Sequence, residues 1–450
     1  MSARILRVWI VTCCLWFWSG SLAAGQTAWA QVRGGVQRPQ TWKTVSELSD
    51  VEKALLDFRT DTPRDANIPY LPAEKFPFQR PYTAEEMGLR AMEFPHSPFW
   101  DCTLVDLAFT VTSSGFMNQR VTLIPILYLL QGGFAEQLYG AKSGQEVYRW
   151  LTQSVSPPER YGNQALWIGY RTDQTFPTKI DMFAYSPALR RIRRQPQPRR
   201  EDRLPNSAAT FDDLIGRDAW EFSWRILGTD VLYDTVRFPV TRQSAILTNE
   251  TGDYIEVQAS DITLMGKDYP VYTERGGVKC FVVEAMPKAA WLKDYYVSKI
   301  IYWLDQEAFF PLRIEEYDQN GKLDFVNARI GTNANPRLGE HGYAVLFDLW
   351  WDISIDLLSA SVHGFLPQQW SEEDKKIFFT PSFMRREWFL APPKGLMSLD
   401  AADEFYLRPP LEEEKFPTER RIELPADLRA LIAAQEREGK LVFGELDGPD

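Results

Sequence analysis

The sequence predicts a mainly β (α+β) protein, built on an antiparallel sheet with a few helices. Short runs rich in β-branched and aromatic residues recur along the chain, bounded by Pro, Asp, Asn or Gly, which is typical of strands joined by turns. The connections between many of these runs are short, so successive strands are expected to pair as an antiparallel meander. Few segments have helical periodicity, and the strands therefore outnumber the helices that could cover them.

The clearest strands lie about two thirds of the way along the chain. Cys280–Ala285, Ser298–Leu304 and Pro311–Tyr317 are apolar or alternating runs, and a short polar connection separates the second from the third. After the third run, an Asn-Gly pair at 320–321 tolerates positive φ, so the chain can reverse there. We expect three consecutive antiparallel strands.

The first 30 residues have the pattern of a cleaved export signal. Arg4 and Arg7 precede an apolar run, Val8–Trp18, and Ala28-Trp29-Ala30 has the small-residue spacing of a cleavage site. We therefore expect cleavage near Ala30 and a mature protein in the periplasm. An uncleaved membrane anchor is the alternative, although an apolar run of about eleven residues is short for a membrane span.

Three regions follow the signal peptide. Residues 31–100 form a Pro-rich arm, in which we expect one helix at Val45–Phe58 and another that a capping box of Thr83 and Glu86 opens. Residues 101–360 are expected to form the sheet. Residues 361–450 carry short helices and an extended acidic tail.

Within the sheet region, one segment is expected to be helical, Ser143–Leu151. The other periodic segments are expected to be strands: Thr103–Val111, Arg120–Leu130, Ala165–Arg171, Lys179–Tyr185, Leu189–Arg194, Trp220–Leu227, Val231–Pro239, Gln243–Asn249, Tyr254–Ala259 and Val271–Glu274. A further strand, Asp348–Leu357, alternates apolar residues with acids, which predicts that Asp348, Asp352 and Asp356 share a solvated face rather than a calcium site.

Composition and motifs argue against several functions. The formal charge is −11, whereas nucleic-acid binding needs a basic surface, so we expect no nucleic-acid partner. After the signal peptide no apolar run is long enough for a membrane helix. The three histidines, His96, His341 and His363, have no metal-ligand spacing, and no nucleophile elbow or phosphate loop is present. We expect no cofactor, no metal and no catalytic residues.

A cluster of arginines interrupts this acidic chain. Arg190, Arg191, Arg193 and Arg194 are followed closely by Arg199, Arg200 and Arg203. The first four are candidates for docking anionic lipid headgroups or an acidic partner. The alternative is a solvated loop whose charges are balanced by neighbouring acids.

Several segments resemble a known family. The run from Lys279 reads KCFVVEAMPK, followed by SKIIYWLDQEAFFPLRIEEYDQNGKL, and an earlier part reads MFAYSPALRRIRRQP, TFDDLIGRD and WRILGTDVLY. This order is similar to that of exported outer-membrane lipoprotein-sorting proteins, in a Gram-negative branch described as a domain of unknown function. The resemblance covers about residues 168–326 and implies a strongly curved half-barrel of the LolA/LolB type with a few covering helices.

The resemblance also implies a function. LolA and LolB shield acyl chains between the sheet and its helices. The resemblance therefore implies that this chain carries a lipid, a lipoprotein acyl chain or another hydrophobic cargo without catalysis, and that an envelope transport complex is a candidate partner. The main alternative is a structural or adaptor component of a cell-envelope complex. The third is an enzyme that acts on lipid or glycan.

Strand parity and cysteine content supply the remaining candidates. The residues expected on the cargo-lining face are Val282, Ile300, Tyr302, Leu304, Leu312 and Ile314. After signal cleavage only Cys102 and Cys280 remain, and in an oxidising compartment they can form one disulfide or stay separate buried thiols.

Overall fold

The computed structural model describes residues 42–75, 78–93, 102–114, 117–129, 136–173, 175–232, 244–248, 254–258, 278–306, 309–332, 344–367 and 372–385. The expected signal peptide and the expected strand at Val271–Glu274 lie outside these residues. So does a helix at Ala426–Glu438, which the sequence predicts from the shared face of Leu428, Leu431 and Ile432.

Most of the described strands belong to one 14-stranded sheet, in the order β1-β10-β13-β14-β15-β16-β17-β18-β4-β5-β6-β7-β8-β9, in which every neighbouring pair is antiparallel. The strands of this sheet are β1 Lys43–Thr44, β4 Cys102–Val111, β5 Met117–Tyr128, β6 Glu146–Ser156, β7 Gln164–Tyr170, β8 Ile180–Ser186, β9 Arg191–Gln195, β10 Phe222–Leu232, β13 Val278–Pro287, β14 Lys299–Asp305, β15 Pro311–Tyr317, β16 Leu323–Thr332, β17 Ala344–Asp352 and β18 Leu357–Pro367. The sheet is not closed, because β1 and β9 end it.

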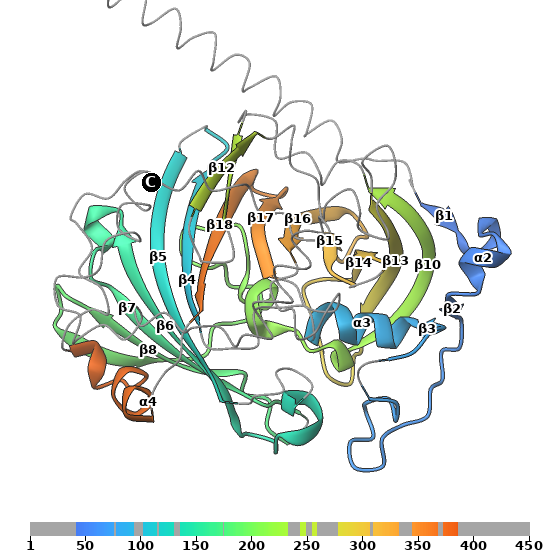
Figure 1. Ribbon diagram of the computed structural model, residues 1–450, viewed down its shortest axis with the longest axis horizontal. Coiled ribbons are helices and arrows are strands. Elements are labelled where there is room, and N and C mark those ends of the chain that lie inside the picture. Colours follow the sequence, from blue (N-terminus) through green and yellow to red (C-terminus); the bar gives the residue numbers. More distant parts are fainter. Residues whose placement is uncertain are drawn as a thin grey trace, which may run out of the picture.

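Two small sheets and several short helices complete the described part. The remaining strands are β2 Leu56–Asp57, β3 Tyr82–Thr83, β11 Ser244–Thr248 and β12 Tyr254–Gln258. The helices are η1 Val45–Glu47, α2 Asp50–Lys53, α3 Ala84–Glu93, η2 Glu136–Gly140, η3 Pro158–Arg160, η4 Asp212–Gly216, η5 Ala219–Glu221, α4 Glu372–Phe378 and η8 Phe383–Arg385. The predicted class, mainly β with a strongly curved antiparallel sheet and few helices, is confirmed (Figure 1).

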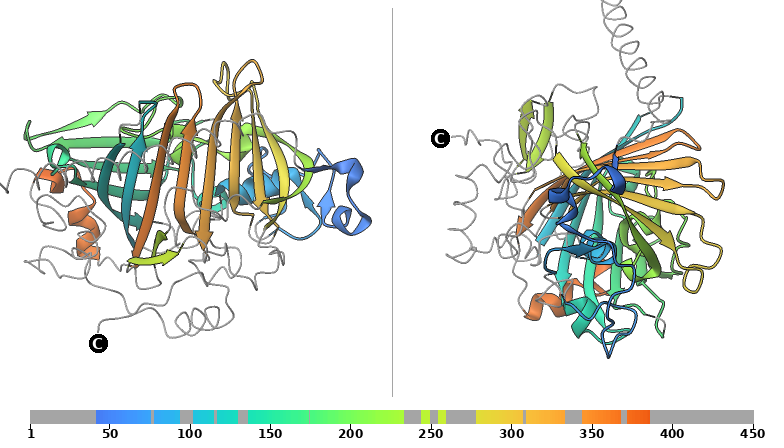
Figure 2. Two further views of the ribbon diagram at one scale, coloured as in Figure 1. Left: turned by 90° about the horizontal axis from the view of Figure 1, so that it is seen from above. Right: turned by 90° about the vertical axis from the view of Figure 1, so that its right-hand side faces the viewer.

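The sheet curves around a concave face, and Figures 1 and 2 show α3 inside the curve beside β10 and β13. The predicted capping box starts this helix, because the Thr83 backbone N–H donates to Glu86 at 2.8 Å and the Glu86 N–H donates to Thr83 Oγ1 at 3.2 Å. Gly88 faces the Trp224 ring so closely that a Cβ at this position would lie 2.3 Å from a ring carbon. The helix therefore packs tightly against the β10 end of the sheet.

A large apolar cluster fills this half of the concavity. It joins α3 and the described part of the arm to the inner residues of β10 and β13–β15, including Phe222, Phe281, Val283, Tyr302 and Ile314. The Pro-rich arm is thus part of the core, because it supplies Leu48, Leu56, Leu71, Phe78 and Tyr82, all less than a tenth exposed.

The convex face of the other half has a separate cluster. Leu151, Leu166 and Ile168 on β6 and β7 pack with Phe379 and Met384 from the segment containing α4 and η8. Residues that alternate with these on β6 and β7 point to the concave face instead.

A segment that we call the crossing segment, residues 199–218, lies over the concave face in the middle of the sheet. Arg203 pairs with Asp352 on β17, the Ala208 N–H donates to Ser359 Oγ on β18 at 2.9 Å, and Thr110 Oγ1 on β4 donates to the Asn206 carbonyl at 2.6 Å. The crossing segment therefore separates the filled half of the concavity from the half formed by β5–β8.

Two local predictions were wrong. The expected helix Ser143–Leu151 is instead the turn and first half of β6. From Trp150 to Val155 half-buried and buried side chains alternate, which is the period of a strand. The expected helix at Val45–Phe58 is reduced to the single turns η1 and α2.

The acidic row is also placed differently from the prediction. β17 ends at Asp352 and a turn follows, in which Asp356 has positive φ. Asp348 and Asp352 are 4% and 6% exposed and form ion pairs with Arg329 and Arg203. They are inside the curve because the crossing segment covers this part of the concave face, not on a solvated face.

The disulfide is not formed. Cys280 is a free, fully buried thiol on β13, and burial raises its pKa well above the ordinary value. Cys102 begins β4, and five strands lie between β13 and β4 in the sheet. Of the two alternatives, the structure has Cys280 as a separate buried thiol.

Candidate functional site

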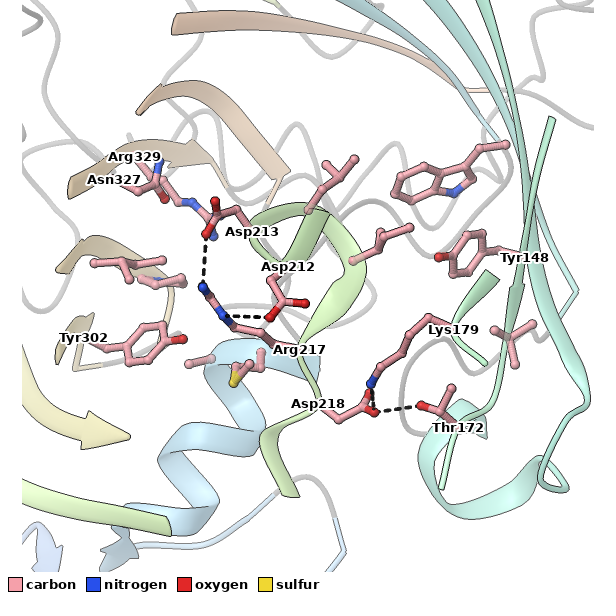
Figure 3. Close-up of a pocket in the computed structure, with 18 of the residues that line it drawn as sticks. Tyr148, Thr172, Lys179, Asp212, Asp213, Arg217, Asp218, Tyr302, Asn327 and Arg329 are labelled. Atoms are coloured by element: carbon pink, nitrogen blue, oxygen red, sulfur yellow. Dashed lines mark hydrogen bonds and ion pairs between the residues drawn. The ribbon is translucent and has the colours of Figure 1, made fainter. Parts of the chain in front are cut away.

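A cavity of about 180 Å³ lies in the concavity, where the crossing segment meets both arms of the curved sheet (Figure 3). One wall is formed by β5–β7 and includes Tyr128, Tyr148 and Trp150. The opposite wall is formed by β14–β16 and includes Tyr302 and Asn327. Residues 212–218 of the crossing segment lie between these walls, so the cavity collects side chains that are far apart in the sequence.

The β6 wall is aromatic and tightly positioned. Tyr148 and Trp150 stack with ring centroids 4.9 Å apart and planes 30° apart. A Cβ at Gly169 on β7 would lie 2.2 Å from the Tyr148 ring, so the absence of a side chain there allows the ring to lie on the β7 backbone. In Figure 3 the Tyr148 hydroxyl points into the cavity.

On the opposite wall, two of the six predicted cargo-lining residues reach the cavity, Tyr302 and Ile314. Burial raises the pKa of Tyr302 to about 12, so its hydroxyl keeps its proton at neutral pH. Ile300 and Leu304 share its face but belong to the filled apolar cluster beside α3. They are core residues rather than cavity lining.

The other two predicted residues do not belong to this lining. Val282 pairs with Trp303, whereas its neighbours Phe281 and Val283 pair with Leu304 and Tyr302 on the concave side. Val282 therefore lies on the opposite face, and its assignment to the shared face was wrong. Leu312 is fully buried at a register shift between β14 and β15 and does not line the cavity.

Charged side chains on the crossing segment are paired. Arg217 contacts Glu316 on β15 at 2.8 Å and Asp213 at 3.1 Å, and it donates to the hydroxyls of Tyr295 and Tyr296 at 2.9 Å each. Burial raises the pKa of Glu316 well above its ordinary value, although the Arg217 charge opposes this shift. The network locks the crossing segment onto β15.

A second charged group lies on the β7–β8 side. Lys179 pairs with Asp218, which also accepts a hydrogen bond from Thr172 Oγ1 at 2.7 Å (Figure 3). Burial alone lowers the pKa of Lys179, but Asp218 and Glu221 outweigh it and the pKa is raised. Lys179 also lines a neighbouring cavity of about 420 Å³, in which Arg200 forms two hydrogen bonds of 2.8 Å to Glu221.

Beyond the cavity, the concave face of β6–β8 is apolar and only half-buried. Trp150 pairs across the sheet with Trp167, which pairs with Met182, while Ala165 pairs with Ala184. All five are partly exposed, although the residues between them on β6 and β7 are buried against the convex cluster. This contrasts with the concave face of β10 and β13–β15, which the arm and α3 cover.

The predicted arginine cluster is divided by the structure. Arg190, Arg191 and Arg193 are exposed at the start and along the edge strand β9, and no ion pair of theirs is recorded among the described residues. Arg194 pairs with Asp181 at 2.5 Å. Arg199, Arg200 and Arg203 are used in ion pairs of the crossing segment. The sequence could not show the roles of Arg194, Arg200 and Arg203, because their partners Asp181, Glu221 and Asp352 lie 13 or more residues away in the chain.

Within the described ranges, no group of three or more His, Cys, Asp or Glu side chains is arranged to hold a metal ion. None of the described helices is long and apolar enough to cross a membrane. The residues that sequence reasoning missed are Tyr148, Trp150 and Trp167. Tyr148 and Trp150 lie in the segment that was interpreted as a helix, whereas Trp167 lies in a correctly predicted strand but was not among the candidate cargo-lining residues.

Comparison with known proteins gives the family. The model of a protein family of unknown function, DUF1329, matches residues 120–344, which is half of the chain. This chain belongs to the DUF1329 family. The matched region runs from β5 to the start of β17 and so includes both walls of the cavity and the crossing segment. A search of curated proteins finds no match.

Solved structures similar to this DUF1329 protein include three bacterial proteins. A Desulfovibrio piger DUF1329 family protein is 13% identical, with 67% of this chain and 95% of that chain covered and a TM-score of 0.44. A Vibrio parahaemolyticus domain named for outer membrane lipoprotein sorting is 15% identical, with 67% and 97% covered and a TM-score of 0.42. A LolA superfamily protein from Nitrosomonas europaea is 12% identical, with 65% and 96% covered and a TM-score of 0.37. The match to the family model confirms the predicted resemblance to a family of unknown function.

Proposed function

We propose that this DUF1329 protein is a non-catalytic binding protein of the periplasm that shields a hydrophobic cargo, a lipid or a lipoprotein acyl chain, on the concave face of its half-barrel. The observation that carries the proposal is the half-buried aromatic and apolar face of β6–β8, formed by Trp150, Trp167, Met182 and their neighbours. Partly open apolar faces next to a cavity are typical of binding sites.

The driving force is the removal of apolar surface from water. Each square ångström of apolar surface buried contributes roughly 25 cal/mol, so an alkyl chain laid along three strands gains a substantial free energy without any covalent step. The cargo is released when a partner or membrane offers an equally apolar environment. An envelope transport complex would supply that environment.

The first test is native mass spectrometry with lipid extraction, on mature protein purified gently from the periplasm of its own cell. A stoichiometric lipid or acylated peptide is expected. Protein that is free of cargo and also fails to bind an apolar environment-sensitive dye would exclude the carrier function.

A paired substitution locates the binding face. Trp167→Glu places a charge on this face, and we expect dye binding to weaken by at least roughly tenfold, because burying an unpaired charge is costly. The control is Leu189→Glu. Leu189 is 55% exposed and lies in the turn before β9, so this variant should bind the dye as the wild type does. Circular dichroism checks that both variants fold. Equal binding by all three proteins would place the cargo elsewhere.

A second candidate, an adaptor in a cell-envelope complex, is favoured by a different observation. Arg190, Arg191 and Arg193 lie exposed at one edge of an otherwise acidic protein, without recorded ion pairs in the described part of the chain. Arg194 is exposed on the same strand, but its charge is paired with Asp181. Such a cationic edge fits an anionic headgroup or an acidic partner.

A further inference from the structure

The charged side chains of the crossing segment belong to one largely buried network that contains more acids than bases. Among the described residues, five carboxyl groups share three cations through ion pairs: Lys179 with Asp218 and Glu221, Arg200 with Glu221 and Asp212, and Arg217 with Asp212, Asp213 and Glu316. If every carboxyl were ionised, the negative charges would outnumber the positive ones in a place with little water. Such an excess is costly, so we expect at least one of these carboxyl groups to keep a proton.

Two of the carboxyl groups meet where the crossing segment touches β15. Glu316 on β15 and Asp213 on the crossing segment contact the same nitrogen of Arg217, Nη1, at 2.8 and 3.1 Å (Figure 3). Their side chains are 4% and 6% exposed, and a hydrogen bond joins the two carboxyl groups. A carboxylate only accepts hydrogen bonds, so one member of this pair must carry a proton.

The surroundings of the pair place this proton on Glu316. Asp213 accepts hydrogen bonds from the Thr210 N–H at 2.6 Å and from Thr210 Oγ1 at 2.8 Å, in addition to its contact with Arg217. Arg217 is the one cation that contacts Glu316 among the described residues. Donated hydrogen bonds favour the ionised form, which is therefore Asp213. Burial raises the pKa of Glu316 well above its ordinary value, and the nearby Asp213 raises it further.

The other titratable groups around the pair do not supply the missing positive charge. Tyr295 and Tyr296, which precede β14, and Tyr302 on β14 have pKa values that burial raises above the ordinary value of tyrosine, so they stay neutral up to about pH 9. Burial raises the pKa of Asp212 as well, but Arg200 at 2.8 Å and the Tyr295 hydroxyl at 2.6 Å both stabilise its charged form. The proton of Glu316 is thus the group that can change the charge of this contact.

We propose that the proton on Glu316, donated to Asp213, latches residues 210–218 of the crossing segment to β15, and that loss of this proton to solvent opens the latch. Without the proton, two carboxylates would repel each other beside a single arginine nitrogen. The rest of the crossing segment keeps its own contacts with β4, β17 and β18. Residues 212–218 lie between the two walls of the cavity, so an open latch removes one side of the candidate site. As a control of cargo binding, the latch rests on the proposed function.

The test measures hydrogen exchange in the full mature protein from pH 5 to pH 9, expressed as protection factors so that the intrinsic pH dependence of exchange is removed. A group whose folded-state pKa is raised stabilises the folded form at low pH, and this contribution is lost as the pH rises. The amides of Thr210 and Asp213, which are hydrogen-bonded within the latch, should therefore lose protection by up to about tenfold for each pH unit, until latched Glu316 has lost its proton. The amide of Ala208, which Ser359 holds, should keep its protection.

Two substitutions should remove this pH dependence. Glu316→Gln places an amide that donates to Asp213 and accepts from Arg217 at every pH, as protonated glutamic acid does, so protection should stay constant from pH 5 to pH 9. Asp213→Asn leaves Arg217 with Glu316 as the one carboxyl of the pair, and protection at Thr210 should be equally constant. The matched control is Glu201→Gln, an exposed acid of the crossing segment outside the network, which should keep the pH dependence of the wild type. Thermal unfolding shows whether the variants are folded.

Constant protection in the wild type would overturn the latch, as would a loss of protection in both variants that equals that of the wild type. The apolar dye should dissociate at least roughly threefold faster at pH 9 than at pH 5 from the wild type, and at equal rates from Glu316→Gln. Equal dye dissociation from the wild type at both pH values would overturn the control of cargo by the latch. Failure to bind the dye at any pH would instead refute the carrier function, whereas hydrogen exchange would still decide whether the latch exists.

Discussion

At the scale of single residues, the concave side of this protein contains many buried ionic groups, each held by opposite charges. Glu221 is a clear case, since it is 5% exposed, accepts two hydrogen bonds from Arg200 and lies 3.4 Å from Lys179. Burial alone raises the pKa of Glu221, but Lys179 and Arg200 outweigh it and the pKa is lowered. The charged form of the Glu221 carboxylate is therefore the one that stabilises the folded protein.

Glu221→Gln is expected to lower the free energy of unfolding by about 3 kcal/mol at pH 7, because it leaves buried Lys179 and half-buried Arg200 with too few acids. A carboxyl group with a lowered folded-state pKa stabilises the protein above its unfolded pKa, and this contribution is lost as the pH falls through the folded value. The difference between variant and wild type should thus shrink below about pH 4.5. Urea unfolding of both proteins at pH values from 7 to 3 measures this difference in the free energy of unfolding.

Glu201→Gln is the control, because Glu201 is exposed and pairs only with exposed Arg199 at 3.4 Å. Its effect should remain within about 0.5 kcal/mol at every pH. A loss for Glu221→Gln that does not depend on pH would contradict the assigned role of its charge.

At the scale of elements, the crossing segment decides how the concavity is used. It has little regular structure beyond the turn of helix η4, and side chains of β4, β5, β17 and β18 hold it to the sheet. Without these contacts its backbone groups would need water, and the two halves of the concavity would merge. The segment is therefore a wall of the candidate site.

Ser359→Ala tests this attachment. The substitution leaves the buried Ala208 N–H without its acceptor, so we expect a loss of about 1–3 kcal/mol and faster hydrogen exchange at Ala208. The control is Ser361→Ala, on the same face of β18, for which no contact with the crossing segment is recorded among the described residues. Equal exchange at Ala208 in both variants would show that Ser359 does not hold the segment.

Elements also show where sequence patterns were sufficient. The meander at β13–β15 was predicted because each strand carries its own apolar pattern and its own turn residues, and α3 was predicted because its cap is encoded within four residues. β6 was missed because only its first half was considered, and the alternation of Trp150, Thr152 and Ser154 lies mostly in the second half. Val282 was assigned to the wrong face, because the sequence did not show which residues of β13 pair with which residues of β14.

At the scale of the whole molecule, the open sheet ends in β9, whose outer edge pairs with no strand in the described part of the chain. Exposed charged residues are a common way to keep such an edge from pairing with another molecule. We therefore expect Arg191 and Arg193 to protect the edge, and they also belong to the exposed arginines on which the adaptor proposal rests.

Arg191→Ala combined with Arg193→Ala separates these roles. If the edge docks anionic headgroups, the double variant should bind phosphatidylglycerol vesicles at least roughly tenfold more weakly than the wild type at low salt, with dye binding unchanged. Arg199→Ala is the control, since Asp202 and Glu201 already pair with Arg199. Vesicle binding that the double variant retains, or that the wild type lacks, would refute headgroup docking. Self-association of the variant would indicate edge protection.

The sequence by itself determined the class of this protein, its central meander, the cap of α3 and its family, because these depend on residues close together in the chain. The tertiary structure alone decided which arginines are exposed, which aspartates are buried and which aromatic residues form the candidate site. These features depend on contacts across the sheet: Tyr148 meets Gly169, Arg203 meets Asp352, and Tyr302 on β14 faces the cavity from seven positions away from β6 in the strand order. Curvature of the sheet brings such residues together, and no local pattern encodes which of them will meet.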